Sequence, residues 1–275
     1  MTDTSDRVAV VVLALDEAER ILPTLTALTA VGVEALVVDG GSTDGTPEVV
    51  RSAGHECVTR TFDGFSAQRN WAMVRSTKEY VLFVDADEVV TPELWRDVLA
   101  AVEMDCDAGW IPTLDYFAGR WMLHGGWYPQ PHLRLLKRTS VRFEGDVHEE
   151  ARFLVEDPRI ATLDHPLVHR SHITLSHYLR KLDRYTEIEA GSRTGSPWLL
   201  VGRGCTEGIA VLVHRLVVRQ GWRDGPQGVV GAVSYAFYRF TIWAKAATAT
   251  SVMDDTTAEA QRVWRRGGRI RPHGR

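Results

Sequence analysis

The chain has 275 residues, of which 44% are hydrophobic and 25% are charged, and its formal net charge is −4. This composition excludes a disordered chain, and the mildly acidic balance gives no indication of nucleic-acid binding. No apolar run reaches the length that a membrane-spanning helix needs. The acidic N-terminus has no signal-peptide pattern and the three cysteines are far apart, so we expect a cytoplasmic protein with reduced thiols.

Strands and helices alternate in the predicted first half of the chain. Runs of β-branched and other apolar residues predict buried strands at residues 7–15, 34–39, 55–62 and 80–84. Capped or amphipathic segments predict helices at residues 16–28, 47–54, 66–77 and 91–102. Regular βαβ alternation of this kind predicts a mostly parallel sheet with helices on both faces.

The second half has a different character. Residues 110–169 form short segments that are rich in aromatic residues and interrupted by glycine and proline, which predicts mixed or antiparallel strands with long loops. Helices are predicted at residues 174–193, 206–220 and 229–247. We therefore expect an α/β domain over residues 1–173 and a helical extension over residues 174–275, which ends in a basic tail.

Acidic residues follow three of the predicted strands. Asp16 follows the first strand, Asp39 follows the second, and Asp85 and Asp87 follow the fourth. In an open parallel sheet, ligands bind beyond the carboxyl ends of the strands, so these acids should meet at one edge. Crowded carboxylates repel one another and are costly to desolvate unless a positive group lies nearby. Asp85 and Asp87 therefore predict a bound divalent cation.

Several motifs, taken in order, carry a family resemblance. VVVLALDEAERI, VVDGGSTDGT, FSAQRNWAM and VLFVDADE resemble the inverting family 2 glycosyltransferases with the GT-A fold. HGGWYPQPHLRLLKR, FEGDVHEE, LVHRSHITLSHYLRKLDRYT and GWRDGPQG are similar to the branch of bacterial lipopolysaccharide-core β-glucosyltransferases. The resemblance covers about residues 7–245 and implies a Rossmann-like, mostly parallel sheet with a helical C-terminal extension. One departure is Asp16-Glu17, where the family often has Asn-Glu.

The resemblance implies a UDP-sugar donor, of the glucose or N-acetylglucosamine type, and a Mg²⁺ or Mn²⁺ ion. Asp87 would bind the ion, and Asp85 would face the ribose or the water shell of the metal. His169 would complete the metal shell or contact the diphosphate, unless it is structural. The carboxylate of Asp39 would accept a hydrogen bond from the uracil imide. The other nucleotide contacts would come from Ala14, Leu15, Asp16, Gln68 and Arg69.

Inversion at the sugar carbon also needs a base for the acceptor proton. The family's VHE pattern within GDVHEE points to Glu149, and Asp146 is the second candidate. The resemblance places the acceptor pocket, which binds the acceptor sugar, at His124, Trp127 and Tyr128. The acceptor itself stays open between a glycan, a lipid-linked glycan and a small natural product.

Two other functions fit parts of the sequence. A haloacid-dehalogenase-like phosphatase would use Asp85 as nucleophile and Asp87 as acid and base, but its motif normally ends the first strand of the domain. A non-catalytic sugar-nucleotide-binding protein would keep the ligands without turnover. The segment 229–247 is apolar on more than one face, so it packs against the domain or a dimer partner, or it contacts the inner face of the membrane with help from the basic tail.

Overall fold

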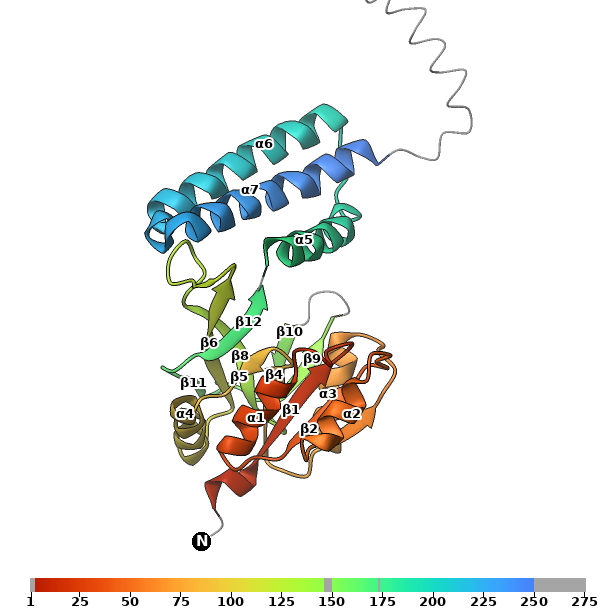
Figure 1. Cartoon of the computed structure of the whole chain (residues 1–275), viewed down its shortest axis with the longest axis vertical. Coiled ribbons are helices and arrows are strands. Elements are labelled where there is room, and N and C mark those ends of the chain that lie inside the picture. Colours follow the sequence, from red (N-terminus) through yellow and green to blue (C-terminus); the bar gives the residue numbers. More distant parts are fainter. Residues whose placement is uncertain (1–2, 146–149, 173, 250–275) are drawn as a thin grey trace, which may run out of the picture.

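The structure is a computed structural model that describes residues 3–145, 150–172 and 174–249. An α/β part that contains the N-terminus lies at one end of the molecule and a stack of helices lies at the other (Figure 1). No helix within these described ranges is long and apolar enough to cross a membrane.

Four parallel strands form the first part of the sheet, in the order β3-β2-β1-β4. The register places Asp39 opposite Ala14 and Asp85 opposite Leu13, so the ends of β2 and β4 flank the end of β1. This confirms the predicted strands and the shared edge. The strands are β1 (Val8–Ala14), β2 (Ala35–Asp39), β3 (Glu56–Thr59) and β4 (Tyr80–Asp85).

Helices cover both faces of these strands, as predicted. A 3₁₀ turn, η1 (Thr4–Arg7), precedes β1, and Thr91 caps α4 by accepting a hydrogen bond from the Leu94 amide. The first helix begins at Leu22 and not at residue 16, because Asp16 has a left-handed φ of 55° that a right-handed helix excludes. Residues 17–21 form one separate turn, in which the Glu17 carbonyl accepts hydrogen bonds from the amides of Arg20 and Ile21. The helices are α1 (Leu22–Ala30), α2 (Thr46–Ser52), α3 (Phe65–Arg75) and α4 (Pro92–Glu103).

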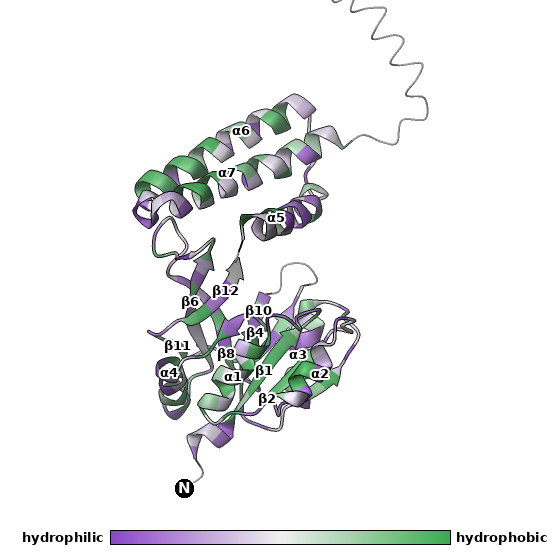
Figure 2. Ribbon diagram, in the orientation of Figure 1, coloured by the Kyte–Doolittle hydropathy of each residue, from purple (hydrophilic) through white to green (hydrophobic). Residues whose placement is uncertain are grey.

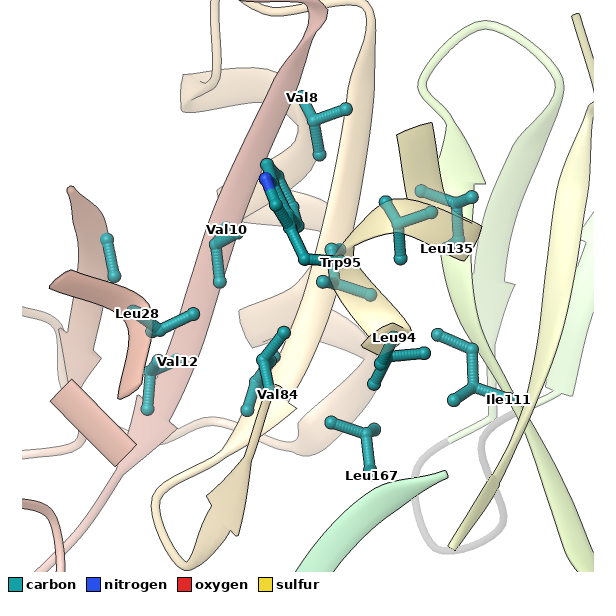
Figure 3. Packing of buried hydrophobic residues seen from close by; sticks show 14 of the residues in the cluster. Val8, Val10, Val12, Leu28, Val84, Leu94, Trp95, Ile111, Leu135 and Leu167 are labelled. Atoms are coloured by element: carbon teal, nitrogen blue, oxygen red, sulfur yellow. The ribbon is translucent and has the colours of Figure 1, made fainter. Parts of the chain in front are cut away.

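The main core lies between the sheet, α1 and α4 (Figure 3). Val10, Val12 and Val84 point from the strands towards Leu94 and Trp95 of α4, and none of these five side chains is more than 6% exposed. A second cluster, which includes Val11 and Phe83, packs on the opposite face with α3. Burial on both faces explains why β1 and β4 are continuous apolar runs.

The second half of the sheet is mixed. β8 is antiparallel to β4 and to β6, β12 is parallel to β6, and the order continues β4-β8-β6-β12-β5. A separate hairpin joins β9 (Val141–Glu144) and β10 (Glu150–Phe153). The other strands are β5 (Glu88–Val89), β6 (Ala108–Phe117), β7 (Arg120–Trp121), β8 (Gln130–Lys137), β11 (Ile160–Thr162) and β12 (Leu167–His172).

Between β12 and residue 249 the chain forms three long helices. They stack so that α7 lies between α5 and α6, and α6 lies farthest from the sheet (Figure 1). The first helix matches the prediction, whereas α6 begins at residue 197, earlier than predicted, with Pro197 in its first turn. The elements are α5 (Leu175–Ala190), α6 (Pro197–Val213), η2 (His214–Val218), η3 (Gly221–Asp224) and α7 (Gly225–Thr248). The predicted boundary between an α/β domain and a helical extension at residue 173 stays a prediction.

Candidate active site

The loops after β1 and β2 bind each other. The carboxylate of Asp16 accepts a hydrogen bond from the Thr43 amide at 2.9 Å, and the Ser42 hydroxyl accepts one from the Asp16 amide at 2.8 Å. Asp16 has a φ of 55°, a left-handed conformation that aspartate tolerates better than most residues. The Ala18 amide donates to Asp44 at 2.9 Å. The two loops thus form one bonded rim at the strand ends.

Asp39 lies under this rim. Its side chain is buried, and its carboxylate accepts hydrogen bonds from the amides of Gly41 and Ser42, each at 3.1 Å to one oxygen. The negative charge is therefore stabilised by the backbone of its own loop. The predicted contact with uracil stays a prediction.

Asp85 is held by an arginine from a distant strand. Arg134 of β8 donates to both carboxylate oxygens of Asp85, at 3.1 and 2.6 Å, and to Glu88 at 2.7 Å. Burial alone would raise the pKa of Asp85, but the charge and hydrogen bonds of Arg134 hold that pKa below its usual range. For Glu88, burial outweighs the attraction of Arg134 and raises the pKa to about 7.

Asp87 forms a chain with His169 and Asp115. His169 lies on β12, with Nε2 at 3.3 Å from Asp87 and Nδ1 at 2.7 Å from Asp115 of β6. Burial alone would lower the pKa of His169, but the hydrogen bonds to Asp115 and Asp87 raise it to about 10. The imidazole is therefore fixed in orientation by one carboxylate on each side.

A cavity of about 370 Å³ opens next to these groups. One wall is polar and comes from the sheet, with Asp85, Asp115 and His169 among its residues. The opposite wall comes from the C-terminal helices and is aromatic. It consists of Tyr178, Leu182 and Tyr185 of α5, Arg215 of η2, and Tyr235 and Tyr238 of α7.

Three of the predicted site residues line this cavity, namely Asp85, Trp127 and His169. Trp127 also packs against Phe117 and Tyr178, with ring centroids 5.4 and 6.0 Å apart. The Nδ1 atom of His124 pairs with the buried carboxylate of Asp224 at 2.8 Å, which joins the loop before β8 to the start of α7. Tyr128 is half-buried beside the cis peptide that it forms with Pro129.

The remaining predicted contacts lie away from the cavity lining. Leu15 is exposed on the first loop, next to Gly40. The amide group of Gln68 is buried and donates to the Arg60 carbonyl at 3.1 Å. The guanidinium of Arg69 lies over the rings of Phe83 and Phe143. Glu149 and Asp146, the two candidate bases, lie outside the described residues.

The structure also adds residues that the sequence prediction missed. Arg134 interrupts the otherwise apolar part of β8, and a single charged residue in a central strand signals a buried partner. Asp115 gives no comparable signal, because its neighbours in sequence are typical of any half-buried strand. The tyrosines of α5 and α7 are hidden in helical patterns that predict packing equally well.

The side chains near Asp87 include some, but not all, of the ligands that a divalent cation needs. Among the described residues, no group of three or more His, Cys, Asp or Glu side chains forms a ready metal cluster. Asp87 with His169 supplies two protein ligands, and a metal-binding histidine usually gives its other ring nitrogen to a carboxylate, as His169 does to Asp115. Both oxygens of Asp85 are already bonded to Arg134.

The chain was compared with known proteins. The family model described as glycosyl transferase family 2 matches residues 9–145. A lipopolysaccharide core biosynthesis glycosyltransferase, LpsC of Rhizobium meliloti, is 30% identical over 77% of this chain and 82% of its own length. A TPR repeat-containing protein of Synechococcus elongatus is also 30% identical, and this chain spans 37% of it.

Solved structures extend the comparison. TarS residues 1–349 of S. aureus, in complex with UDP-GlcNAc, is 15% identical with a TM-score of 0.46, over 93% of this chain and 78% of that chain. Glucosyl-3-phosphoglycerate synthase of Mycobacterium tuberculosis, in complex with Mn²⁺ and UDP-glucose, is 14% identical with a TM-score of 0.45, over 66% of this chain and 76% of that chain.

The class of this protein follows from the family match and from LpsC: it is an enzyme that transfers glycosyl groups. Its mixed α/β sheet, flanked by helices and followed by C-terminal helices, agrees with the predicted GT-A fold. The chain belongs to glycosyltransferase family 2. The phosphatase interpretation of Asp85 and Asp87 is thereby set aside.

Proposed function

We propose that the chain transfers a sugar of the glucose or N-acetylglucosamine type from a UDP-sugar to a carbohydrate acceptor, with inversion. The observation that carries this proposal is the edge of the sheet in a family 2 chain: Asp39 and Asp85 end the strands beside β1, and Asp85 lines a cavity together with His169, which pairs with Asp87. Ligands of open α/β sheets bind at such an edge.

The nucleotide would lie across the rim formed by the first two loops. Asp39 would accept a hydrogen bond from the uracil imide N–H, using a lone pair that the amides of Gly41 and Ser42 do not occupy. Asp85 would face the ribose, because Arg134 fixes its carboxylate and offsets its charge. The rim residues Ala14, Leu15 and Asp16 would frame the base, and Gln68 and Arg69 would support this region from behind.

Asp87 and His169 would hold a Mg²⁺ or Mn²⁺ ion, with Asp115 fixing the imidazole of His169. When bound, the ion supplies positive charge that stabilises the departing diphosphate. The role of Asp115 and of Arg134 is to hold the ligand-bearing side chains in place before the donor arrives.

The acceptor would enter the aromatic side of the cavity. Trp127, Tyr178 and Tyr235 offer flat apolar surfaces with polar edges, which suit the faces of sugar rings. Arg215 lines the same wall, with its guanidinium 3.7 Å from the centre of the Tyr235 ring and one nitrogen donating to the Gly125 carbonyl at 3.0 Å. The name of the Rhizobium relative supports a lipopolysaccharide-type or other lipid-linked glycan acceptor.

The transfer itself is a displacement at the anomeric carbon. An acceptor oxygen forms its bond to that carbon as the bond to the diphosphate oxygen breaks, and the acceptor proton passes to a carboxylate. We assign that carboxylate to Glu149, with Asp146 as the alternative. Asp85 and Asp87 would lie on the leaving-group side, and Asp39 at the nucleotide end. We further propose that residues 1–173 form the catalytic domain and that the enzyme works in the cytoplasm.

A donor panel tests this function. Purified protein is incubated with UDP-, GDP- and CDP-sugars, with Mn²⁺ or EDTA, and with lipopolysaccharide-core oligosaccharides, and the released nucleotide and the product anomer are measured. We expect release of UDP alone, only with metal, and a β-linked product from an α-linked donor. Turnover of a sugar phosphate without any nucleotide release would overturn the proposal, and so would UDP binding without transfer to any acceptor.

A further inference from the structure

The hairpin of α6 and α7 exposes a set of large apolar side chains. Trp198 is 86% exposed, Ile209 is 64% exposed and Phe237 is 59% exposed. Ile209, Val213 and Val217 are four residues apart, and Trp198, eleven residues before Ile209, lies on the same side of the helix. On α7, Val230, Val233 and Phe237 are three and four residues apart. Figure 2 shows apolar residues where α6 ends and α7 begins. We call the set the outer face: Trp198, Leu199, Ile209, Val213, Val217, Val230, Val233 and Phe237.

Glycines of α6 form its side of the contact with α7. Gly204 and Gly208 of α6 are buried against α7, where a Cβ on Gly208 would lie 3.2 Å from the Ala236 carbonyl oxygen. A Cβ on Gly204 would lie 3.0 Å from that of Trp243. Helices that pack in water normally turn their largest apolar side chains towards each other. In this hairpin α6 contributes glycines to the contact, packed against Trp243 and Phe240 of α7, and leaves its own Trp198 and Ile209 exposed.

Charges are also found inside the hairpin. Glu207 of α6 accepts a hydrogen bond from Nε of Arg239 at 2.7 Å and another from the indole of Trp243, both on α7. Small residues and polar bonds between helices, with apolar side chains outside, are the arrangement of helices surrounded by lipid. The helices are too short or too polar to span a bilayer, so they would lie along its surface.

The hairpin region has an excess of basic residues, although Lys245 is paired with Asp183 and Glu187 of α5. Between residues 191 and 249 the sequence has seven arginine or lysine residues and only two acids, Glu207 and Asp224. Both acids are engaged, because Glu207 binds Arg239 and the buried Asp224 binds the loop at His124. Arg219 and Arg223 are exposed near Trp222 at the turn between the helices. An apolar face bordered by such charges complements a surface of anionic lipids.

We propose that the outer face binds a membrane that contains anionic lipids, with α6 lying in the boundary between headgroups and acyl chains. A second copy of the chain fits less well, because a symmetric dimer would bring two basic regions together. The structure thus identifies α6, with α7 beside it, as the element in contact with lipid.

α7 connects the outer face to the cavity, because it contributes side chains to both. α7 carries Phe237 on the outer face, while Tyr235 and Tyr238 line the cavity. If the proposed transfer to a lipid-linked glycan holds, the acceptor would reach the cavity from the same membrane. Membrane binding itself does not depend on the transfer reaction, so the two proposals fail independently.

Flotation of the full-length protein with vesicles tests the proposal. We expect it to float with vesicles of phosphatidylcholine and phosphatidylglycerol, less so with phosphatidylcholine alone, and less at high salt. The triple variant Trp198→Ser, Ile209→Ser, Phe237→Ser should reduce the bound fraction about tenfold or more, because burial of these side chains drives insertion. UDP binding should be unchanged, which also shows that the variant is folded.

A matched control changes three exposed apolar residues far from the hairpin: Val74→Ser, Met104→Ser and Leu154→Ser. It should float like the wild type. Equal flotation of the hairpin variant and the wild type would overturn the proposal and leave the basic tail as the binding element. Absence of flotation on anionic vesicles would overturn it too. So would a dimer in solution, measured by light scattering, that the hairpin variant converts to monomers.

Discussion

Asp39 and Asp85 end the two strands that flank β1, but their charges are stabilised in different ways. Asp39 bonds to the amides of Gly41 and Ser42, two and three residues further along the chain. Asp85 bonds to Arg134, which is 49 residues away on an antiparallel strand. The same residue type at the same edge is therefore supported locally in one case and by tertiary structure in the other.

The difference shows which part of the molecule sets each part of the site. The N-terminal strands supply the carboxylates, while the second half supplies Arg134, His169 and the carboxylate of Asp115 that hold or orient them. We therefore expect substitutions in the second half to affect stability and metal binding, and substitutions in the first loops to affect the nucleotide alone.

The largest effect is expected from Arg134→Met. Removing the guanidinium leaves Asp85 and the fully buried Glu88 without their partner, and breaking a buried pair in this way costs about 3–5 kcal/mol of unfolding free energy. Urea denaturation measures the loss. Arg75→Met, which breaks the exposed pair with Glu56, should stay near the wild type. Equal stability of the two variants would show that Arg134 has no special role.

Glu149→Gln tests a residue that only the sequence identifies. The amide keeps the shape of the side chain but cannot take up the acceptor proton, so kcat should fall roughly 10²–10⁴-fold with donor affinity nearly unchanged. Steady-state kinetics with a saturating UDP-sugar gives this number. Near-normal turnover, together with a collapse in Asp146→Asn, would transfer the role to Asp146.

Much of the fold could be predicted from the sequence, because β1 to β4 are apolar runs that end in turn residues, and each strand or helix forms from its own neighbours. The predicted start of α1 was wrong because Asp16 has a left-handed backbone, held by its bonds to Ser42 and Thr43 of the next loop, and no local pattern shows those contacts. The acids at the strand ends were predictable for the same local reason as the strands.

The partners of those acids could not be predicted. The pairing of Arg134 with Asp85 depends on β8 lying antiparallel to β4, and that of His169 with Asp115 depends on β12 lying beside β6. Short strands interrupted by glycine and proline leave such pairings open, since many registers satisfy the same pattern. The aromatic wall of the cavity depends in turn on how α5 and α7 pack over the sheet.

Asp115→Ala gives an intermediate effect. His169 would lose the carboxylate that fixes its ring, and loss of such a partner typically costs 10–100-fold in metal affinity or activity. The Mn²⁺ concentration that half-saturates UDP binding measures it. Asp97→Ala removes a carboxylate from another histidine, His165, at the similar distance of 2.9 Å but on the surface, and should leave the Mn²⁺ dependence unchanged. If neither variant changed the dependence of UDP binding on Mn²⁺, His169 would not be a metal ligand.

The smallest effect is expected at the local carboxylate. Asp39→Asn keeps a side-chain oxygen for the amides of Gly41 and Ser42 but loses the negative charge that would strengthen the hydrogen bond from the uracil imide N–H. Uridine nucleotides should bind about 1–3 kcal/mol more weakly. Calorimetry with UDP and CDP checks this, because the preference for UDP should shrink as well. Unchanged affinity for both nucleotides would mean that Asp39 only holds its loop.

The most direct test of the account is the effect of metal on UDP binding. Calorimetric titrations of UDP in Mn²⁺ and in EDTA compare the wild type with Asp87→Asn and with Asp6→Asn, an exposed carboxylate just before β1. The account predicts that Mn²⁺ strengthens UDP binding about tenfold or more in the wild type and in Asp6→Asn, and that Asp87→Asn loses this gain. Equal UDP affinity in Mn²⁺ and EDTA for the wild type, or a full metal effect in Asp87→Asn, would contradict it.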